Sequence, residues 1–224
     1  MTPGARRRRV VLVYRGPASL PGCAEAVAQT VVAAGLVPRF VGPHERLPLD
    51  VRALSGAAAY AQPGGDELDR AWPLLRGVAP TIRDYVSGGG AYLGYCLGAY
   101  LAGHDPGFGL LPGDTDQYTA APSATVRDGR DTVVAVRWRG RTRRVYFQDG
   151  AAVHLRPDAD AQVLARYDDG PVAAVVCRYG RGRVGVLGPH PEATRDWFTD
   201  AGLDPPSPLA TDLAVDLLLA TLGR

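Results

Sequence analysis

The sequence predicts an α/β fold in which a mainly parallel sheet is followed by a region of antiparallel strands. In the first half of the chain, short apolar runs alternate with helical segments, which is the pattern of parallel strands joined by helical crossovers. From Thr132 onward, strand-like runs follow one another directly, and glycine-containing turns separate several of them. With 224 residues, of which 46% are hydrophobic and 21% charged, the chain is expected to form a single domain over residues 1–224.

Three strands are predicted early in the chain, the first of them from a continuous apolar run that suits a central parallel strand. They cover Val10–Tyr14, Val37–Val41 and Ala57–Gln62, and helices are predicted between them over Cys23–Ala34 and Leu49–Leu54. Helices over 68–75 and 81–87 then lead into a short strand at 91–93, which is followed by a helix of small residues over 97–102. Ligands bind beyond the carboxyl ends of the strands in open sheets of this kind, so the segments after the third and fourth strands are the expected place for a site.

The second half of the chain is predicted to be mostly strand. Residues 107–125 come first and are predicted to be a loop, because glycine and proline punctuate them. Antiparallel strands are predicted over 132–138, 143–147, 162–167 and 172–179, and one more strand covers 183–187. A final helix over 210–222 places Leu213, Leu217 and Leu218 on one face, where they are expected to pack against the sheet.

Composition excludes several classes of protein. No apolar run approaches the roughly 20 residues that span a bilayer, and the net charge of +2 comes without an aromatic and basic surface for nucleic acid. All 25 basic residues are arginine, so the chain has no lysine for a Schiff base, a Walker A motif or biotin attachment. The histidines and cysteines lack metal-ligand spacing, and we expect neither a metal nor another cofactor.

Cysteine usage and the amino terminus bear on the compartment. Three cysteines, Cys23, Cys96 and Cys177, are too few and too widely spaced for a disulfide framework, and a reducing cytoplasm fits them best. Residues 1–8 are expected to form a basic arm. The arginines there superficially suggest an export signal, but the apolar run that follows ends at Arg15, which is too short for one.

One glycine-rich motif carries the strongest chemical signal. Gly94-Tyr-Cys96-Leu-Gly98 lies between a predicted strand and a predicted helix, in the G-x-C-x-G pattern of a turn that presents a nucleophile. Unpaired N–H groups and the dipole at the helix start favour the thiolate of Cys96, which is the reactive form. For Cys96 alone, the competing interpretation is a buried, inert cysteine. Gly64 and Gly65, after the third strand, can offer N–H groups to an oxyanion beside that of Leu97, and a plain turn is the alternative.

His190 and Glu192 follow the last predicted strand and supply partners for such a thiol. A cysteine nucleophile needs a base within hydrogen-bond reach, and the base needs an acidic partner that fixes its tautomer. Residues two apart at a strand end point to the same side, so the two side chains are expected to contact each other or to line up behind Cys96. Taken separately, a surface histidine and a solvated carboxylate are the alternatives.

The order of these motifs resembles the class I glutamine amidotransferase-like superfamily. Segments 13–17, 88–101 and 145–150 are similar to the amidotransferase-like domain found at the N-terminus of eukaryotic biotin-protein ligases and as free-standing bacterial proteins. The resemblance implies a flavodoxin-like three-layer α/β/α fold, with Cys96 as nucleophile, His190 as base and Glu192 as the residue that orients His190. It also implies that an oxyanion meets the N–H groups of Gly65 and Leu97, with Gly98 in the same substrate-binding turn.

Two positions depart from the usual motifs of this family. Tyr100 stands where glutamine-using members commonly carry the last residue of G-x-C-x-G-x-Q. Gln148-Asp149-Gly150 stands where the biotin-ligase-like group tends to have Asn-Gly-Gly. Tyr100, Gln148 and Asp149 are therefore candidates for contact with substrate, and for the last two a simple turn between strands is an equal alternative.

The sequence is compatible with three functions. The first is a cysteine-dependent amidase or glutamine amidotransferase that acts on a small-molecule amide, with a synthetase or ligase partner receiving any ammonia. The second is a cysteine hydrolase of a different amide, a peptide or an ester. The third is a non-catalytic binding or regulatory module. Arginines at 137, 139, 141, 143 and 144 line a predicted hairpin, which indicates a solvated strand face or a surface for an acidic ligand.

Overall fold

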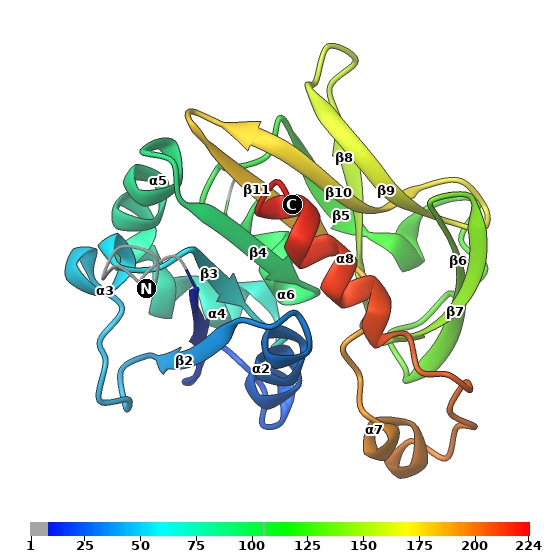
Figure 1. Cartoon of the computed structure of the whole chain (residues 1–224). Coiled ribbons are helices and arrows are strands. Elements are labelled where there is room, and N and C mark those ends of the chain that lie inside the picture. The colour runs from blue at the N-terminus through cyan, green and yellow to red at the C-terminus, as the bar shows by residue number, and fades with distance from the viewer. Residues whose placement is uncertain (1–8, 105) are drawn as a thin grey trace.

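One large mixed sheet forms the centre of the molecule (Figure 1). The computed structural model describes residues 9–104 and 106–224. Its parallel part contains β1 (Val10–Tyr14), β2 (Val37–Val41), β3 (Ala59–Gln62), β4 (Ala91–Tyr95) and β11 (Gly182–Leu187). These strands pair in the order β2-β1-β3-β4-β11, and every pair is parallel. All residues of β3 and β4 are buried, as expected for strands that helices cover on both faces.

Helices cover both faces of this parallel part, which gives three layers. α2 (Cys23–Ala33) and α8 (Thr211–Thr221) share one hydrophobic core with one face of the sheet. The other face packs against α3 (Val51–Ser55), α4 (Leu68–Leu75), α5 (Ala79–Ser87) and α6 (Leu97–Leu101). In Figure 1, α2 and α8 lie in front of the sheet. The predicted three-layer α/β/α fold with a mainly parallel sheet is confirmed.

Antiparallel strands extend the sheet beyond β11. They are β6 (Thr132–Trp138), β7 (Arg141–Phe147), β8 (Ala151–Leu155), β9 (Ala161–Tyr167) and β10 (Val172–Tyr179). The path continues from β11 through β10 and β9 to the β6–β7 hairpin, while β8 pairs with β10 at one position. The predicted antiparallel region is therefore present at one side of the parallel sheet.

The predicted loop over residues 107–125 is wrong in part. Gly113–Gln117 forms the strand β5, and Tyr118–Ala120 forms a 3-10 helix, η2. β5 is polar, Gly-Asp-Thr-Asp-Gln, and has no apolar alternation by which sequence could reveal it. It exists because it pairs with β8 along its whole length, from Gly113 opposite Leu155 to Gln117 opposite Ala151. Strand β8, helix α7 (Arg195–Asp200) and the 3-10 helix η1 (Arg76–Val78) were not predicted either.

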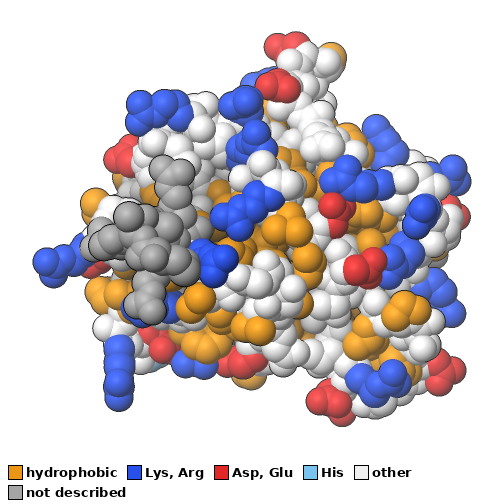
Figure 2. Space-filling view, viewed as in Figure 1, with side chains coloured by type: hydrophobic (Ala, Val, Ile, Leu, Met, Phe, Trp, Pro, Cys, Tyr) orange, Lys and Arg blue, Asp and Glu red, His pale blue; other side chains and the backbone are white. Residues whose placement is uncertain are grey.

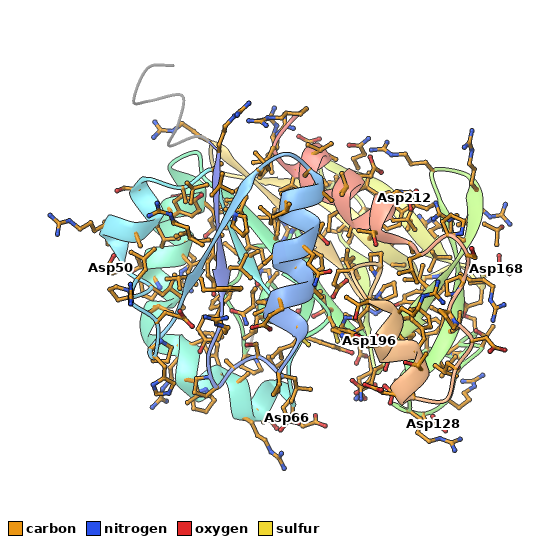
Figure 3. All side chains as sticks on the ribbon, turned by 60° about the horizontal axis from the view of Figure 1, so that its bottom comes forward. Asp50, Asp66, Asp128, Asp168, Asp196 and Asp212 are labelled. Atoms are coloured by element: carbon orange, nitrogen blue, oxygen red, sulfur yellow. The ribbon has the colours of Figure 1, made fainter. Side chains whose placement is uncertain are left out.

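Two arginines of the β6–β7 hairpin pair with acidic residues of α8. Arg139 pairs with Asp216 at 2.7 Å, and Arg143 pairs with both oxygens of Asp212 at 2.7 Å. Asp212 lies on α8 in Figure 3, and Figure 2 shows basic and acidic side chains together over this part of the molecule. Arg137, Arg139, Arg141 and Arg144 are exposed, which supports the interpretation of the hairpin as a solvated strand face.

The carboxyl ends of the parallel strands lie along one edge of the sheet. β3 leads into Gly64, β4 into Cys96, and β11 into the segment that contains His190. The edge predicted to hold a site is thus where the candidate residues meet. No helix in residues 9–104 and 106–224 is long and apolar enough to cross a membrane. The predicted basic arm, residues 1–8, lies outside the described residues.

Candidate active site

Cys96 occupies a sharp turn between β4 and α6. Its φ of 49° and ψ of −103° form a backbone conformation that residues with a side chain rarely adopt. The flanking glycines make the turn fit: a Cβ on Gly94 would come 2.3 Å from the carbonyl oxygen of Gly98, and a Cβ on Gly98 would come 2.2 Å from that of Gln62. The G-x-C-x-G pattern therefore reflects the close approach of strand, turn and helix. Gly98 packs behind the turn, against β3.

His190 and Glu192 form a buried pair after β11. Nδ1 of His190 lies 2.8 Å from Oε1 of Glu192, and the two residues are only 4% and 3% exposed. The backbone N–H of His190 donates to the carbonyl of Tyr146 at 2.7 Å, and the ring packs edge-on against Trp197 with a centroid separation of 5.3 Å. The expectation that residues 190 and 192 contact each other is met, and these contacts fix the orientation of the imidazole.

Electrostatics favour a charged His190. Burial alone lowers the pKa of this histidine, but the negative charges of Cys96 and Glu192, and hydrogen bonds to both side chains, outweigh burial and raise the pKa to about 10. Because Glu192 takes Nδ1, the remaining ring nitrogen, Nε2, is the one available to Cys96. The arrangement can hold an imidazolium between a carboxylate and a thiolate.

The turn between β7 and β8 closes over the cysteine. Sγ of Cys96 lies 3.6 Å from the carbonyl oxygen of Gln148, to which the protonated thiol can donate, and the hydroxyl of Tyr100 donates to the carbonyl of Asp149 at 3.0 Å. Asp149 has a positive φ of 45°, and its carboxylate accepts from the Gln117 amide at 3.0 Å. The segment is a turn between strands, as one interpretation held, and it also forms a wall of the candidate site.

Gly64 and Gly65 lie against the other candidate residues. A Cβ on Gly64 would meet Cε1 of His190 at 2.9 Å, and a Cβ on Gly65 would meet the Leu97 side chain at 2.4 Å. Neither the N–H of Gly65 nor that of Leu97 donates to another protein group in the described part of the chain. Two free backbone donors therefore flank the turn that carries Cys96.

A cleft of about 460 Å³ opens at this point. Six predicted site residues line it: Gly65, Cys96, Leu97, Tyr100, Gln148 and Asp149. Sequence reasoning missed the other lining residues, which include Asp66, Glu67, Asp69 and Asp116. For Asp66 and Glu67 a signal existed, because they directly follow Pro63-Gly64-Gly65. Asp116 could not be found, because the strand that carries it was predicted to be a loop.

The other cysteines are buried and unpaired. Burial is the main cause of a raised pKa at both positions. It raises the pKa of Cys23, and it raises the pKa of Cys177 to about 12. Neither environment favours a thiolate, in keeping with the packing roles expected for them. Within residues 9–104 and 106–224, no group of three or more histidine, cysteine or acidic residues is arranged to hold a metal ion.

The part of the chain that contains the Cys96 turn matches a known family model. Residues 10–111 match the family model described as "Biotin-protein ligase, N terminal". The chain thus resembles the amidotransferase-like domain of the biotin-protein ligases, as its motifs predicted. The matched stretch ends before His190 and Glu192. No curated protein matches the sequence.

Solved structures share the fold over nearly the whole chain. A glutamine amidotransferase from Thermotoga maritima is 14% identical with a TM-score of 0.61, over 97% of this chain and 99% of that one. A putative GMP synthase component from Thermoplasma acidophilum is 14% identical with a TM-score of 0.60, over 96% and 93%. A β-galactosidase from Rahnella is 16% identical with a TM-score of 0.55, over 96% of this chain but 31% of that one. The chain therefore has the glutamine amidotransferase-like fold, which also occurs as one part of glycosidases.

Proposed function

We propose that this protein is a cysteine-dependent amidohydrolase of the glutamine amidotransferase-like kind, acting through Cys96, His190 and Glu192. The proposal rests on one observation above all: a buried His190–Glu192 pair, 2.8 Å apart, interacts with a cysteine at a strained strand-to-helix turn. Neither an inert core cysteine nor a surface histidine needs such an arrangement. The fold alone does not carry the proposal, because glycosidases contain it too.

In the proposed acylation step, Sγ of Cys96 attacks the amide carbon, so that a C–S bond forms and negative charge moves to the carbonyl oxygen. The free N–H groups of Gly65 and Leu97 would stabilise this oxyanion. His190 gives its proton to the departing nitrogen, the C–N bond breaks, and a thioester to Cys96 remains.

In the proposed second step, water attacks the thioester and His190 accepts the proton of that water. The C–S bond breaks, the carboxylic acid leaves, and the thiolate of Cys96 is restored. Glu192 keeps the imidazole in one tautomer and stabilises its charged form in both steps. If the departing group is ammonia, a synthetase or ligase partner would receive it, and one structural relative is a putative component of a synthase.

Tyr100 supports a substrate other than glutamine. Its hydroxyl donates to the carbonyl of Asp149, so this side chain is engaged in holding the β7–β8 turn. A glutamine side chain at this position, as in the motif of glutamine-using relatives, would present an amide there instead. The second candidate function is accordingly a cysteine hydrolase of another amide, with the same residues in the same roles.

The test is labelling of the intact protein by a diazoketone glutamine mimic and by iodoacetamide, with peptide mass spectrometry of wild type, Cys96→Ser and His190→Gln. We expect iodoacetamide to modify Cys96 faster than Cys23 or Cys177, and this preference to be lost in His190→Gln. Selective reaction of Cys96 with the glutamine mimic would favour glutamine as substrate, and reaction with iodoacetamide alone would favour another amide. A Cys96 that reacts no faster than the other two cysteines would contradict the proposal and favour a non-catalytic binding module.

A further inference from the structure

The cleft beside Cys96 carries a strong charge asymmetry. Five of its lining residues are carboxylates: Asp66, Glu67, Asp69, Asp116 and Asp149. None of its lining residues is arginine or histidine, although the whole chain has 25 basic residues against 23 acidic ones and a net charge of +2. The cleft is therefore acidic in a protein that is slightly basic.

Local helix structure explains only part of this asymmetry. Asp66, Glu67 and Asp69 lie at the start of α4, where the helix dipole favours acidic residues. Asp66 is labelled in Figure 3. Asp116 comes from β5 and Asp149 from the β7–β8 turn. Three segments far apart in the sequence thus bring carboxylates to one cleft, two of them without a helix start to account for the charge.

Most of these carboxylates keep their charge free for a ligand. Asp66 is paired with Arg70 at 2.7 Å, outside the cleft lining. In the described part of the chain, Glu67, Asp69 and Asp116 form no ion pair. The partners of Asp149 are the neutral side chains of Gln117 and Thr119, so its negative charge is not neutralised. Such carboxylates attract the cationic group of an organic ligand, and within the described residues no three of them are arranged as a metal-binding group.

The position of Cys96 in the cleft shows where a cationic ligand would lie relative to the reactive thiol. Cys96, which is 7% exposed, lines the same cleft, and its thiol interacts with the buried His190 behind it. In a cleft of about 460 Å³, any small molecule that reaches this thiol lies among the carboxylates. A group such as the α-carboxylate of glutamine would find no cationic side chain among the lining residues, and it would be repelled.

We propose that the substrate is an amide that carries an ammonium or guanidinium group and has no carboxylate beside the scissile bond. This inference rests on the proposed function, because it assigns the charge of the molecule that Cys96 attacks. Asp116, Glu67 and Asp69 would bind the cationic group, while the amide carbonyl reaches Cys96. The cationic end of the substrate would thus lie against the carboxylates, and the amide end would lie against the thiol of Cys96.

The test uses three methanethiosulfonate reagents that share one reactive group and differ in charge: trimethylammonioethyl, methyl and sulfonatoethyl. Second-order rates of Cys96 modification are measured on the intact wild-type chain by peptide mass spectrometry. We expect the cationic reagent to react about tenfold or more faster than the anionic one, and the ratio to shrink as ionic strength rises. The double variant Glu67→Gln, Asp116→Asn should lose most of the ratio. The matched control Asp84→Asn, Asp204→Asn, which removes two exposed carboxylates outside the cleft, should keep it.

The neutral reagent separates this inference from the proposed function. Fast modification of Cys96 by the neutral reagent, with equal rates for the cationic and anionic ones, would overturn the cationic substrate and leave the reactive cysteine standing. Failure of the neutral reagent to modify Cys96 faster than Cys23 or Cys177 would overturn both. A rate ratio that the control pair lowers as much as the cleft pair would assign the preference to the general field of the protein and overturn the inference as well.

Discussion

At the scale of single residues, Cys96 is the position where the fold opposes local preference. A non-glycine residue at φ 49° and ψ −103° is strained by about 1–3 kcal/mol. The surroundings impose this conformation: the N–H of Cys96 donates to the carbonyl of Leu187 at 2.9 Å, and close contacts of Gly94 and Gly98 leave the turn no room to relax. The turn places Cys96 between β4 and the start of α6, where it lines the cleft.

The strain predicts an unusual ranking of two variants. Cys96→Gly should be more stable than Cys96→Ala by about 1 kcal/mol, because glycine adopts a positive φ without strain while alanine does not. Urea unfolding of the two variants measures this difference. Both variants lack the thiol and should show no covalent labelling at this position. An alanine variant as stable as the glycine variant would mean that Cys96 is not strained in solution.

Glu192 should act through His190. In Glu192→Gln, the lost carboxylate charge should lower the pKa of His190, since that charge and its hydrogen bond are among the causes that raise the pKa to about 10. The rate of Cys96 chemistry should fall by about 100-fold or more. Titration of the imidazole by NMR reports the pKa, and the rate of Cys96 alkylation reports the chemistry. The control is Asp196→Asn, an exposed carboxylate on α7 that is labelled in Figure 3, and it should change neither.

At the scale of elements, the site depends on how closely α6 approaches β3. A Cβ on Gly98 would lie 2.2 Å from the backbone oxygen of Gln62, and a backbone atom cannot move aside as a flexible side chain can. Gln62 is itself fixed, because its amide donates to the carbonyl of Ala18 at 3.1 Å and its oxygen accepts from Tyr60. The helix that follows Cys96, α6, can therefore pack against the sheet in only one position.

Gly98→Ala should disrupt the packing of α6 against β3. We expect a loss of stability of about 2 kcal/mol or more, together with loss of Cys96 reactivity, because α6 must move away from β3. Gly77→Ala is the matched control: a Cβ there meets nothing within 4 Å, and the change should leave stability unchanged or raise it by about 0.4–1 kcal/mol. Thermal unfolding of both variants makes the comparison. Equal effects of the two substitutions would contradict this account of the G-x-C-x-G motif.

At the scale of the whole molecule, the features that could be predicted from the sequence are those that a local residue pattern determines. The strand Val10–Tyr14 follows from its continuous apolar run and the Cys96 turn follows from its flanking glycines. The contact of His190 with Glu192 follows from their spacing. β8 was missed although its apolar residues Ala151 to Val153 are buried and gave a local signal. β5 could not be predicted, because it is polar and is stabilised by its pairing with β8. The acidic cleft was missed because Glu67, Asp116 and Asp149 become neighbours only in the folded chain.

The interactions of His190 with Cys96 and Glu192 should link the proton of this histidine to the stability of the whole fold. Its pKa of about 10 lies above the roughly 6.5 expected in the unfolded chain, so folding favours the protonated form. The resulting stabilisation is fully present below about pH 6.5 and is lost as the pH rises through 10.

The free energy of unfolding of wild type should therefore exceed that of His190→Gln by more at pH 6.5 than at pH 10. Because each pKa unit corresponds to about 1.4 kcal/mol, the difference between the two proteins should change by at least about 1 kcal/mol over this range. Urea unfolding at several pH values measures it, with His154→Gln, the loss of an exposed histidine, as the matched control. A difference that stays constant or grows with pH would mean that His190 is buried in its neutral form, and the imidazolium on which the proposed acylation step depends would then be absent.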